Sequence, residues 1–448
     1  MAISPAVVRG KEGPAPSARA EDDRYELYKL LVDTIDQVER NYVNELDRRE
    51  LFEAAIQGVL SKLDPYSSYI SPEEVKQFRA SVESEFGGIG IQIGMADGRL
   101  KVLSPLVGTP AYKAGILAGD WIVEIDGKST TDISIDEAVK RLKGEPGTKV
   151  TLGVLTEGAK LKRTMEVARE RIHVETVLGD HRSEDDAWSF LLDGEPRVGY
   201  IRLTAFSRDT AQELRQALEK LKADKVRGLV LDLRFNPGGL LSAAIEVADL
   251  FVSKGRIVST KGRNSQERAW DAKNNAVFED VPMVVLVNRY SASASEIVAA
   301  CLQDNKRAAI VGERTWGKGS VQNVIELEEG ASALKLTTAA YRRPSGKNIH
   351  RFNTSDENGE WGVTPDDGCE LKLDATELAD MMQDRRDRDI VRPRPAATDT
   401  ADAKEAAGVK EAAGVKPPNG AAATSRAAAD RQLELAVKHL TEQLARVD

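Results

Sequence analysis

The hydrophobic positions of the chain change their spacing several times, and each change predicts a different kind of element. Apolar residues recur at helical spacing between residues 25 and 63, which predicts two amphipathic helices. A third helix is predicted from Ser71, which is followed by proline and two glutamates, to about residue 83. From residue 198 onward, continuous apolar runs that predict buried strands alternate with helical patterns such as residues 209–221. This alternation indicates an α/β core with parallel strands.

The region between these two parts is rich in glycine. At residues 85–93, Ile89, Ile91 and Ile93 alternate with other residues and predict a strand that is entered through a glycine turn. Successive N–H groups in a tight glycine turn can bind an anion, and an exposed strand edge can add a peptide strand. A glycine turn inside a small barrel is the alternative interpretation. The elements predicted to follow are strands at residues 100–103, 121–125 and 149–155 and a helix at residues 136–142.

Two segments have the composition of flexible chain. Residues 1–24 are rich in proline, alanine and glycine and predict a disordered leader. Residues 393–429 are of low complexity, repeat a six-residue run, and predict a flexible linker. After this linker, Asp430 is predicted to cap a terminal helix whose apolar stripe needs a surface to dock on: Leu433, Val437, Leu440 and Leu444.

Composition narrows the class of protein. The chain has 448 residues, room for two or three domains, and its 41% apolar and 30% charged content is ordinary for a globular protein. A net charge of −9 without a strongly basic patch argues against a nucleic-acid partner. No run approaches the ~18 apolar residues of a membrane span, and no signal peptide is visible. The two cysteines, Cys301 and Cys369, imply no disulfide framework, and neither a cofactor nor a metal is expected.

Residues 281–322 contain the strongest candidate chemistry. An apolar run at residues 284–287 predicts a buried strand, and Ser291, Ser293 and Ser295 alternate with alanine before a helical pattern at residues 296–302. Hydroxyl groups at such a junction lie beside free backbone N–H groups and the positive end of the helix dipole. This position suits a nucleophile whose attack creates a negatively charged oxygen.

A lysine between two glycines, Lys318, follows a second apolar run and allows four interpretations. A phosphate-binding P-loop fits residues 312–318, but Gly319 occupies the Ser/Thr position and residues 321–327 predict a strand. A Ser/Lys dyad requires burial that keeps the lysine neutral. A helix-capping serine and a solvent-facing lysine are the structural interpretation, which the residues alone favour. A Ser-His-Asp triad would need one of four histidines, of which only the third is plausible: His173, His181, His350 and His439.

The order of the motifs resembles a known family. Gly88-Ile89-Gly90-Ile91, with Leu117-Ala-Gly-Asp-Trp-Ile and Ile125-Asp-Gly, resembles a PDZ domain and its carboxylate-binding loop. With three further motifs, the chain resembles the carboxyl-terminal processing proteases, which are tail-specific serine peptidases. These motifs are Leu231-Asp-Leu-Arg-Phe-Asn-Pro-Gly-Gly, Ser291-Ala-Ser-Ala-Ser-Glu-Ile and Gly317-Lys-Gly. The similarity covers residues 25–366 and 430–444. A non-catalytic PDZ scaffold that binds C-termini is the alternative function.

The resemblance implies a multidomain α/β fold. It comprises a crotonase/ClpP-like peptidase core (171–392), an inserted PDZ domain (84–170), an N-terminal helical region (25–83) and a C-terminal helix (430–448). Peptide or protein substrates with apolar C-terminal tails, an unidentified adaptor, and a homodimer formed through the terminal helices are the partners it implies. It also implies a periplasmic or other extracytoplasmic location.

Catalytic roles are implied in the same way. The nucleophile is the middle serine, Ser293, and the base is the lysine 25 residues later, Lys318. Gln322 helps to hold the lysine, and Asp304 is either catalytic or a structural cap at a helix end. The implied oxyanion donors are the N–H groups of Ala294 and of Gly239 or Gly238, and the implied tail-binding residues are Gly88, Ile89, Gly90 and Ile91.

Two positions depart from the family pattern. Tyr290 stands where many relatives have a small residue before the serine run. Lys143 stands where relatives often carry an arginine that is thought to couple the PDZ domain to the active site. Lysine keeps the charge but not the planar fork of arginine, so any bidentate contact at this position is weakened. This departure concerns the implied coupling between the PDZ domain and the active site, and not the implied nucleophile or base.

Overall fold

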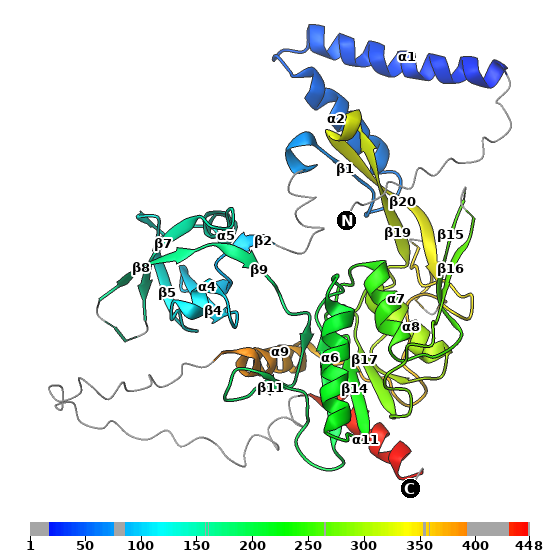
Figure 1. The fold of residues 1–448 in the computed structure, drawn as a ribbon. Coiled ribbons are helices and arrows are strands. Elements are labelled where there is room, and N and C mark those ends of the chain that lie inside the picture. The colour runs from blue at the N-terminus through cyan, green and yellow to red at the C-terminus, as the bar shows by residue number, and fades with distance from the viewer. Residues whose placement is uncertain are drawn as a thin grey trace. The chain divides into compact units, whose positions relative to one another are not determined.

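The computed structural model describes residues 18–75, 86–156, 158–159, 161–263, 266–352, 355–357, 359–391 and 430–446 (Figure 1). The chain forms two compact units. The predicted linker and residues 76–83 of the third predicted helix lie outside the described residues. Within the described ranges, no helix is both long enough and apolar enough to cross a membrane. The first unit comprises Met1–Val82, Arg256–Asp271 and Gly317–Gly362, and the second comprises Glu83–Gly255, Ala272–Trp316 and Val363–Asp448.

Two helices and an antiparallel sheet form the first unit. Helix α1 (Ala18–Asn41) begins inside the predicted leader, so the prediction of disorder is wrong from Ala18 onward. Alanine, arginine and glutamate, which are strong helix formers, explain this early start. Helix α2 (Arg48–Leu60) begins after Asp47, whose carboxylate accepts two backbone hydrogen bonds. The strands are β1 (Ser68–Ile70), β15 (Arg256–Gly262), β16 (Arg268–Asp271), β19 (Ser320–Leu327) and β20 (Ser332–Arg342), in the order β1-β20-β15-β16 with β19 also paired to β20; η1 (Glu328–Gly330) joins β19 to β20.

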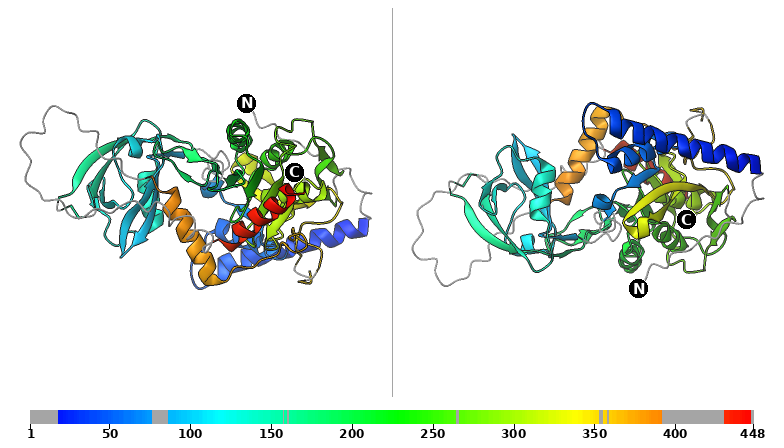
Figure 2. Two further views of the ribbon diagram at one scale, coloured as in Figure 1. Left: turned by 90° about the horizontal axis from the view of Figure 1, so that it is seen from below. Right: turned by 90° about the horizontal axis from the view of Figure 1, so that it is seen from above.

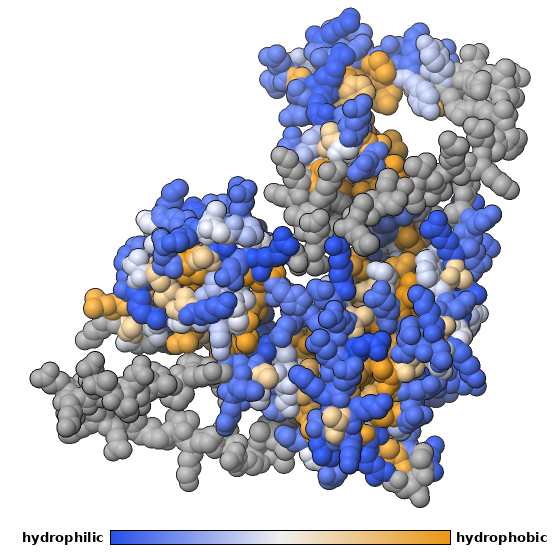
Figure 3. Space-filling model, viewed as in Figure 1, coloured by the Kyte–Doolittle hydropathy of each residue, from blue (hydrophilic) through white to orange (hydrophobic). Residues whose placement is uncertain are grey.

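Helix α1 leaves several large apolar side chains in solvent. Leu27 and Leu30 are 64% and 63% exposed, and Tyr25 and Tyr28 are exposed to a similar degree. Apolar residues of this helical region are visible at the top of Figure 3. A helix whose apolar positions remain exposed has an unoccupied apolar face.

The glycine-rich region forms a small barrel-like sheet in the second unit. Its strands pair antiparallel in the order β3-β4-β5-β7-β8, so β3 lies at an edge. Leu100, Ile122 and Leu152 lie in its buried core. The predicted strands and helix of this region are confirmed. Its elements are β2 (Phe86–Gly88), β3 (Ile91–Ala96), β4 (Arg99–Pro105), α4 (Pro110–Lys113), β5 (Trp121–Ile125), β6 (Lys128–Ser129), α5 (Ile135–Leu142), β7 (Lys149–Leu155), β8 (Arg163–Ala168) and β9 (Glu170–Ile172).

The remainder of the second unit is the predicted α/β core. Strands β13, β14, β17 and β18 are parallel neighbours, and a helix follows each of the first three; between the helix after β14 and β17 the chain also forms β15 and β16 of the first unit. The multidomain α/β class is therefore confirmed. The elements are β10 (Val177–Leu178), β11 (His181–Arg182), β12 (Trp188–Ser189), β13 (Val198–Leu203), α6 (Thr210–Ala223), β14 (Gly228–Asp232), α7 (Leu241–Asp249), β17 (Met283–Val287), α8 (Ala294–Asp304), β18 (Ala309–Gly312), α9 (Ala375–Asp389) and α11 (Arg431–Leu444).

Helices cover both faces of the parallel sheet. Gly199 of β13 faces Leu221 of α6, whereas its neighbour Tyr200 belongs to the cluster that packs against α11. Because successive residues of a strand point to opposite faces, α6 and α11 lie on opposite sides. The predicted apolar stripe of α11 is buried against the sheet, and Figure 2 shows this helix, in red, beside the strands. The C-terminal helix thus docks on the core of its own chain.

Candidate active site

The three alternating serines between β17 and α8 have different environments. Ser291 and Ser295 are fully buried, and their hydroxyl groups donate to the carbonyl oxygens of Leu233 (2.8 Å) and Asn236 (2.9 Å). Ser293 is only half-buried and lies at the N-terminus of α8 with a φ of 57°. A non-glycine residue in this region is strained, and such strain is common where a side chain must be held for function. The structure therefore separates Ser293 from its two neighbours.

A buried carboxylate holds the backbone of Ser293. The Ser293 N–H donates to Glu296 Oε2 at 2.8 Å, and the hydroxyl of Thr315 donates to Glu296 Oε1 at 2.5 Å. Thr315 Oγ1 in turn accepts a hydrogen bond from the Val363 N–H at 2.8 Å. Glu296 was not predicted as a site residue. The spacing of Ser293 and Glu296, which is that of a capping box, is the signal that could have identified it.

The glycine turn after β14, formed by Asn236-Pro237-Gly238-Gly239, packs directly against Ser293. A Cβ atom added to Gly238 would lie 2.7 Å from Ser293 Cβ and 2.9 Å from the Ala294 nitrogen, so only glycine fits. The Gly238 N–H donates to Asn236 Oδ1 at 2.9 Å. Among the described residues, the N–H groups of Gly239 and Ala294 have no protein acceptor. Ala294 follows Ser293 in the chain, and Gly239 follows Gly238, which packs against Ser293, so both N–H groups are candidate donors near the serine.

Asn288 joins the glycine turn to the serine turn. Its Oδ1 atom accepts hydrogen bonds from the N–H groups of Phe235 and Tyr290, both at 3.1 Å. The rings of Phe235 and Tyr290 stack with centroids 5.3 Å apart. The ring of Tyr290 thus packs on the residue that precedes the glycine turn.

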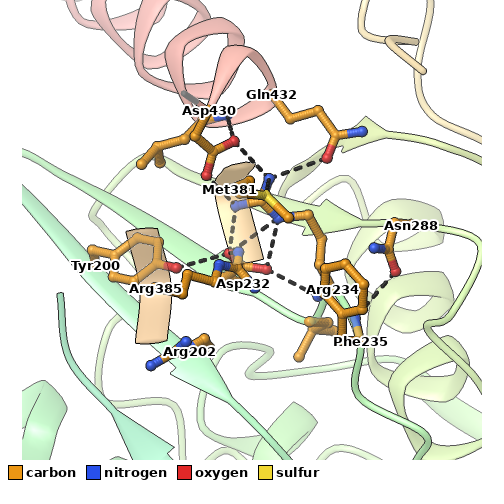
Figure 4. A network of polar contacts seen from close by, with 12 residues as sticks. Tyr200, Arg202, Asp232, Arg234, Phe235, Asn288, Met381, Arg385, Asp430 and Gln432 are labelled. Atoms are coloured by element: carbon orange, nitrogen blue, oxygen red, sulfur yellow. Dashed lines mark hydrogen bonds and ion pairs between the residues drawn. The ribbon is translucent and has the colours of Figure 1, made fainter. Parts of the chain in front are cut away.

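A network of buried charges lies at the end of β14, directly before the glycine turn (Figure 4). Arg234 donates to Asp232 Oδ2 at 2.7 Å and to the two carboxylate oxygens of Asp430 at 2.7 and 2.8 Å. Tyr200 and Arg385 also donate to Asp232. Burial opposes ionisation of both aspartates, but the charge of Arg234 outweighs it and holds the pKa of each carboxyl below its ordinary value. Sequence analysis missed this network.

In the first unit, Lys318 lies in a tightly packed loop. A Cβ atom on Gly319 would lie 2.3 Å from the backbone nitrogen of His350, and Gly317 has a φ of 87°. Lys318 is half-buried, and its Nζ atom lies 5.0 Å from the centroid of the Tyr66 ring. The Tyr66 ring also meets the His350 ring edge-on. The two candidate bases, lysine and histidine, thus belong to the same unit.

Gln322 lies on β19, and its amide donates to Ser320 Oγ at 2.8 Å and to Thr337 Oγ1 at 3.2 Å. Thr337 Oγ1 donates to Asp64 at 3.2 Å. The residues after Gly319 form a strand, as the sequence predicted. A phosphate-binding P-loop requires a helix at this point, so that interpretation is wrong.

The start of the lysine loop is attached to the serine turn within the second unit. The Trp316 N–H donates to the Ser291 carbonyl oxygen at 3.0 Å. Thr315, which precedes Trp316, contacts Glu296 as described above. The second unit ends at Trp316, two residues before Lys318 in the sequence.

The other predicted residues have varied positions. Asp304 ends α8, roughly 16 Å along the helix axis from Ser293 at 1.5 Å per residue, which favours its structural interpretation. Lys143 is exposed at the end of α5. In the predicted tail-binding loop, the Gly90 carbonyl accepts a hydrogen bond from the Leu106 N–H, and Ile91 begins the edge strand β3.

Three histidines have partners away from the serine turn. His173 contacts Glu213 at 2.7 Å, His181 contacts Asp180 at 3.1 Å, and His439 lies 3.7 Å from Cys369. Burial lowers the pKa of the fourth, His350, so that its neutral form is favoured at pH 7.

Comparison with known proteins yields three family matches. Residues 197–367 match peptidase family S41, residues 101–156 match a PDZ domain, and residues 9–74 match the activating protease CtpB N-terminal domain. The carboxy-terminal-processing protease of Bartonella bacilliformis is 42% identical over 77% of this chain and 76% of its own length. The carboxyl-terminal-processing protease of Synechocystis sp. is 35% identical over 81% and 84%. The solved photosystem II D1 C-terminal processing protease is 32% identical over 77% of this chain and 92% of its own, with a TM-score of 0.45.

Proposed function

Because the chain belongs to the carboxy-terminal processing proteases of peptidase family S41, we propose that it is an endopeptidase that uses a Ser293/Lys318 dyad. One observation carries this proposal: Ser293 is the strained, half-buried serine of its run, and it packs against a glycine turn. The other two serines support the loop with their hydroxyl groups.

The reaction begins with proton transfer from Ser293 to a neutral Lys318. A serine hydroxyl is a weak nucleophile and needs a base, and a lysine can serve when its neutral form is populated. The serine oxygen then attacks the scissile carbonyl carbon. The protonated lysine gives its proton to the leaving amine, and water hydrolyses the acyl-enzyme. Half-burial of Lys318 supports this role, and Gln322 keeps the following strand in place.

The tetrahedral oxygen is stabilised by two backbone donors. We assign them to Ala294 and Gly239, because the N–H of Gly238 already donates to Asn236. Each donor of this kind contributes on the order of 3 kcal/mol to transition-state stabilisation. Since Gly239 belongs to a close-packed turn and Ala294 is the first residue of the buried helix α8, these donors need little reorganisation during the reaction.

Substrate recognition is assigned to the PDZ domain. The glycine turn that contains Gly88, Ile89 and Gly90 is proposed to bind the terminal carboxylate, and the edge strand that begins at Ile91 to pair with the tail. Lys143 is proposed to contribute to coupling between tail binding and cleavage. Substrates with apolar tails are therefore expected to be preferred.

We further propose a homodimer formed through the N-terminal helices. The exposed apolar residues of α1 support it, whereas the apolar stripe of α11 is buried in its own chain. An extracytoplasmic location is proposed from the family resemblance.

The test compares Ser293→Ala and Lys318→Ala with Lys261→Ala, an exposed lysine in the same unit as Lys318. Both active-site variants are expected to lose cleavage of an apolar-tailed peptide while keeping the melting temperature of the parent. Retained turnover in either one contradicts the dyad. A fluorophosphonate probe that labels the parent but not Ser293→Ala excludes a non-catalytic PDZ scaffold.

A further inference from the structure

The N-terminal end of the C-terminal helix reaches Arg234 mainly through Asp430, the residue that caps the helix. This aspartate precedes α11 in the sequence, and its carboxylate caps the helix by accepting a hydrogen bond from the Leu433 N–H at 3.0 Å. The same carboxylate receives both terminal nitrogens of Arg234. The side chains of Arg234 and Asp430 are 0% and 2% exposed. The contact is therefore bidentate and shielded from water.

Packing of α11 fixes where Asp430 lies. Leu433, Ala436 and Leu440 pack with the residues of the parallel sheet that face them. Gln432 adds two polar contacts, because its oxygen accepts from Arg234 at 3.1 Å and its nitrogen donates to the Leu371 carbonyl at 2.7 Å. The helix cannot rotate or slide without moving the carboxylate away from Arg234.

The network is balanced in charge only when Asp430 is present. Asp232 and Arg385 form one oppositely charged pair, and Arg234 with Asp430 forms the second. Burial raises the pKa of Tyr200 to about 12, so this phenol stays neutral. Without the Asp430 carboxylate, a buried arginine would keep an uncompensated charge.

Arg234 lies two residues before the turn Asn236-Pro237-Gly238-Gly239, which holds the proposed oxyanion donor. The next residue, Phe235, has a φ of 62° and donates its N–H to Asn288, which also holds the turn of Tyr290. The preceding residue, Leu233, accepts the hydroxyl of Ser291. A displacement of Arg234 is therefore transmitted to both turns that contact Ser293.

From these contacts we infer that Asp430 is a positioning residue: docked α11 supplies the carboxylate that fixes Arg234 and, through it, the glycine turn that stabilises the transition state. The inference rests on the proposed function, since it assigns the purpose of the turn. Asp430 itself does not contact substrate, so its effect is on kcat and not on substrate binding.

The experiment uses the full chain and three variants. Asp430→Asn removes the charge, and Glu434→Gln removes a charge from an exposed position of the same helix as a matched control. The double variant Asp430→Asn/Arg234→Met restores the charge balance, so it remains folded even if the single variant does not. Peptide cleavage and fluorophosphonate labelling are measured well below the melting temperature of each variant.

Asp430→Asn is expected to lower kcat about 10- to 100-fold with KM unchanged, while Glu434→Gln behaves like the parent. The double variant is expected to regain thermal stability but not kcat, an outcome that a merely structural role would not produce. Parental kcat in either Asp430 variant overturns the inference. Ser293→Ala, measured in parallel, tests the proposed function separately, because its loss of turnover does not depend on Asp430.

Discussion

In the second unit Ser293 is surrounded by buried groups with defined partners, whereas in the first unit Lys318 lies half-buried against an aromatic ring. Glu296 holds the Ser293 backbone through a 2.8 Å hydrogen bond, Gly238 packs closely against Ser293, and Asn288 holds the neighbouring Phe235 backbone. The lysine loop is fixed through its backbone glycines, while the amine contacts the face of Tyr66.

This difference separates two properties of the catalyst. Groups that stabilise charge in the transition state work best when they are preorganised, which suits the buried serine turn. A general base works best when its pKa is near the working pH, and a few adjustable contacts are enough to set it. We therefore expect changes in the serine turn to reduce kcat and changes around the lysine to shift the pH dependence.

The largest effect is expected for Gly238→Ala, which should lower kcat at least about 100-fold, the loss that follows removal of an oxyanion donor. The added Cβ would displace Ser293 and the Ala294 nitrogen. Steady-state cleavage of a peptide checks this. Gly194→Ala is the matched control, since Gly194 also has a positive φ but open space around it. Equal losses in both variants would show that backbone strain, and not the contact with Ser293, is responsible.

Acid should lower the free energy of unfolding of the second unit more than that of the first. The pKa of Asp430 is depressed in the folded state, so its stabilising effect is complete above the unfolded value of about 3.9 and is lost as pH falls through the folded value. Asp430→Asn is expected to lower the free energy of unfolding by about 3–5 kcal/mol at pH 7. Urea unfolding should show this difference shrinking below about pH 4.

Asp64 of the first unit provides the comparison for this acid effect. Burial opposes its ionisation, but hydrogen bonds from Tyr66 and Ser67 hold its pKa below the ordinary value, and it is partly exposed. Asp64→Asn is therefore expected to destabilise less than Asp430→Asn. A larger destabilisation by Asp64→Asn than by Asp430→Asn would contradict the expected difference in acid sensitivity between the two units.

An intermediate effect is expected for Glu296→Ala. Backbone strain of the kind seen at Ser293 costs about 1–3 kcal/mol and persists only while neighbours hold it, so kcat should fall roughly 10- to 100-fold. Single-turnover acylation of Ser293 is the measurement. Glu137→Ala, at the equivalent position of α5, should leave acylation unchanged. An acylation rate in Glu296→Ala equal to that of the parent would indicate that the Ser293 backbone keeps its conformation without the Glu296 carboxylate.

The smallest effect concerns the identity of the base. A ring beneath an ammonium group favours its charged form by about 0.5–1 kcal/mol, so Tyr66→Leu should lower the apparent pKa of kcat/KM by roughly half a unit. The pH–rate profile checks this shift.

If His350 were the base, the profile would instead rise below pH 6.5, because burial lowers the pKa of that histidine. His350→Phe should abolish activity only in that case.

Much of the fold could be predicted from local pattern. The apolar runs at β14 and β17 and the helical spacing of α6 identify buried strands and a covering helix, because burial imposes a period on the sequence. The predicted extent of the leader was wrong at Ala18, where intrinsic helix propensity continues beyond the apolar pattern.

The candidate site was harder to predict from the sequence than the fold. Resemblance selected Ser293, whereas the residues alone allowed any of three serines; the structure separates them by their hydrogen bonds. Asp430 was predicted as a helix cap, which is confirmed, but its contact with Arg234 was not predicted. Periodicity records which face of an element is buried and not which distant residue meets it, so contacts between remote positions leave no local signal.

The pairing of Arg234 with Asp430 also has a consequence for biosynthesis. The two residues are separated by 196 positions, so the ribosome makes the aspartate long after the arginine. Domains fold as they emerge at about 5–20 residues per second, which leaves the glycine turn without its anchor for roughly 10 to 40 seconds. The proposed oxyanion site would therefore be complete only after most of the chain has been translated.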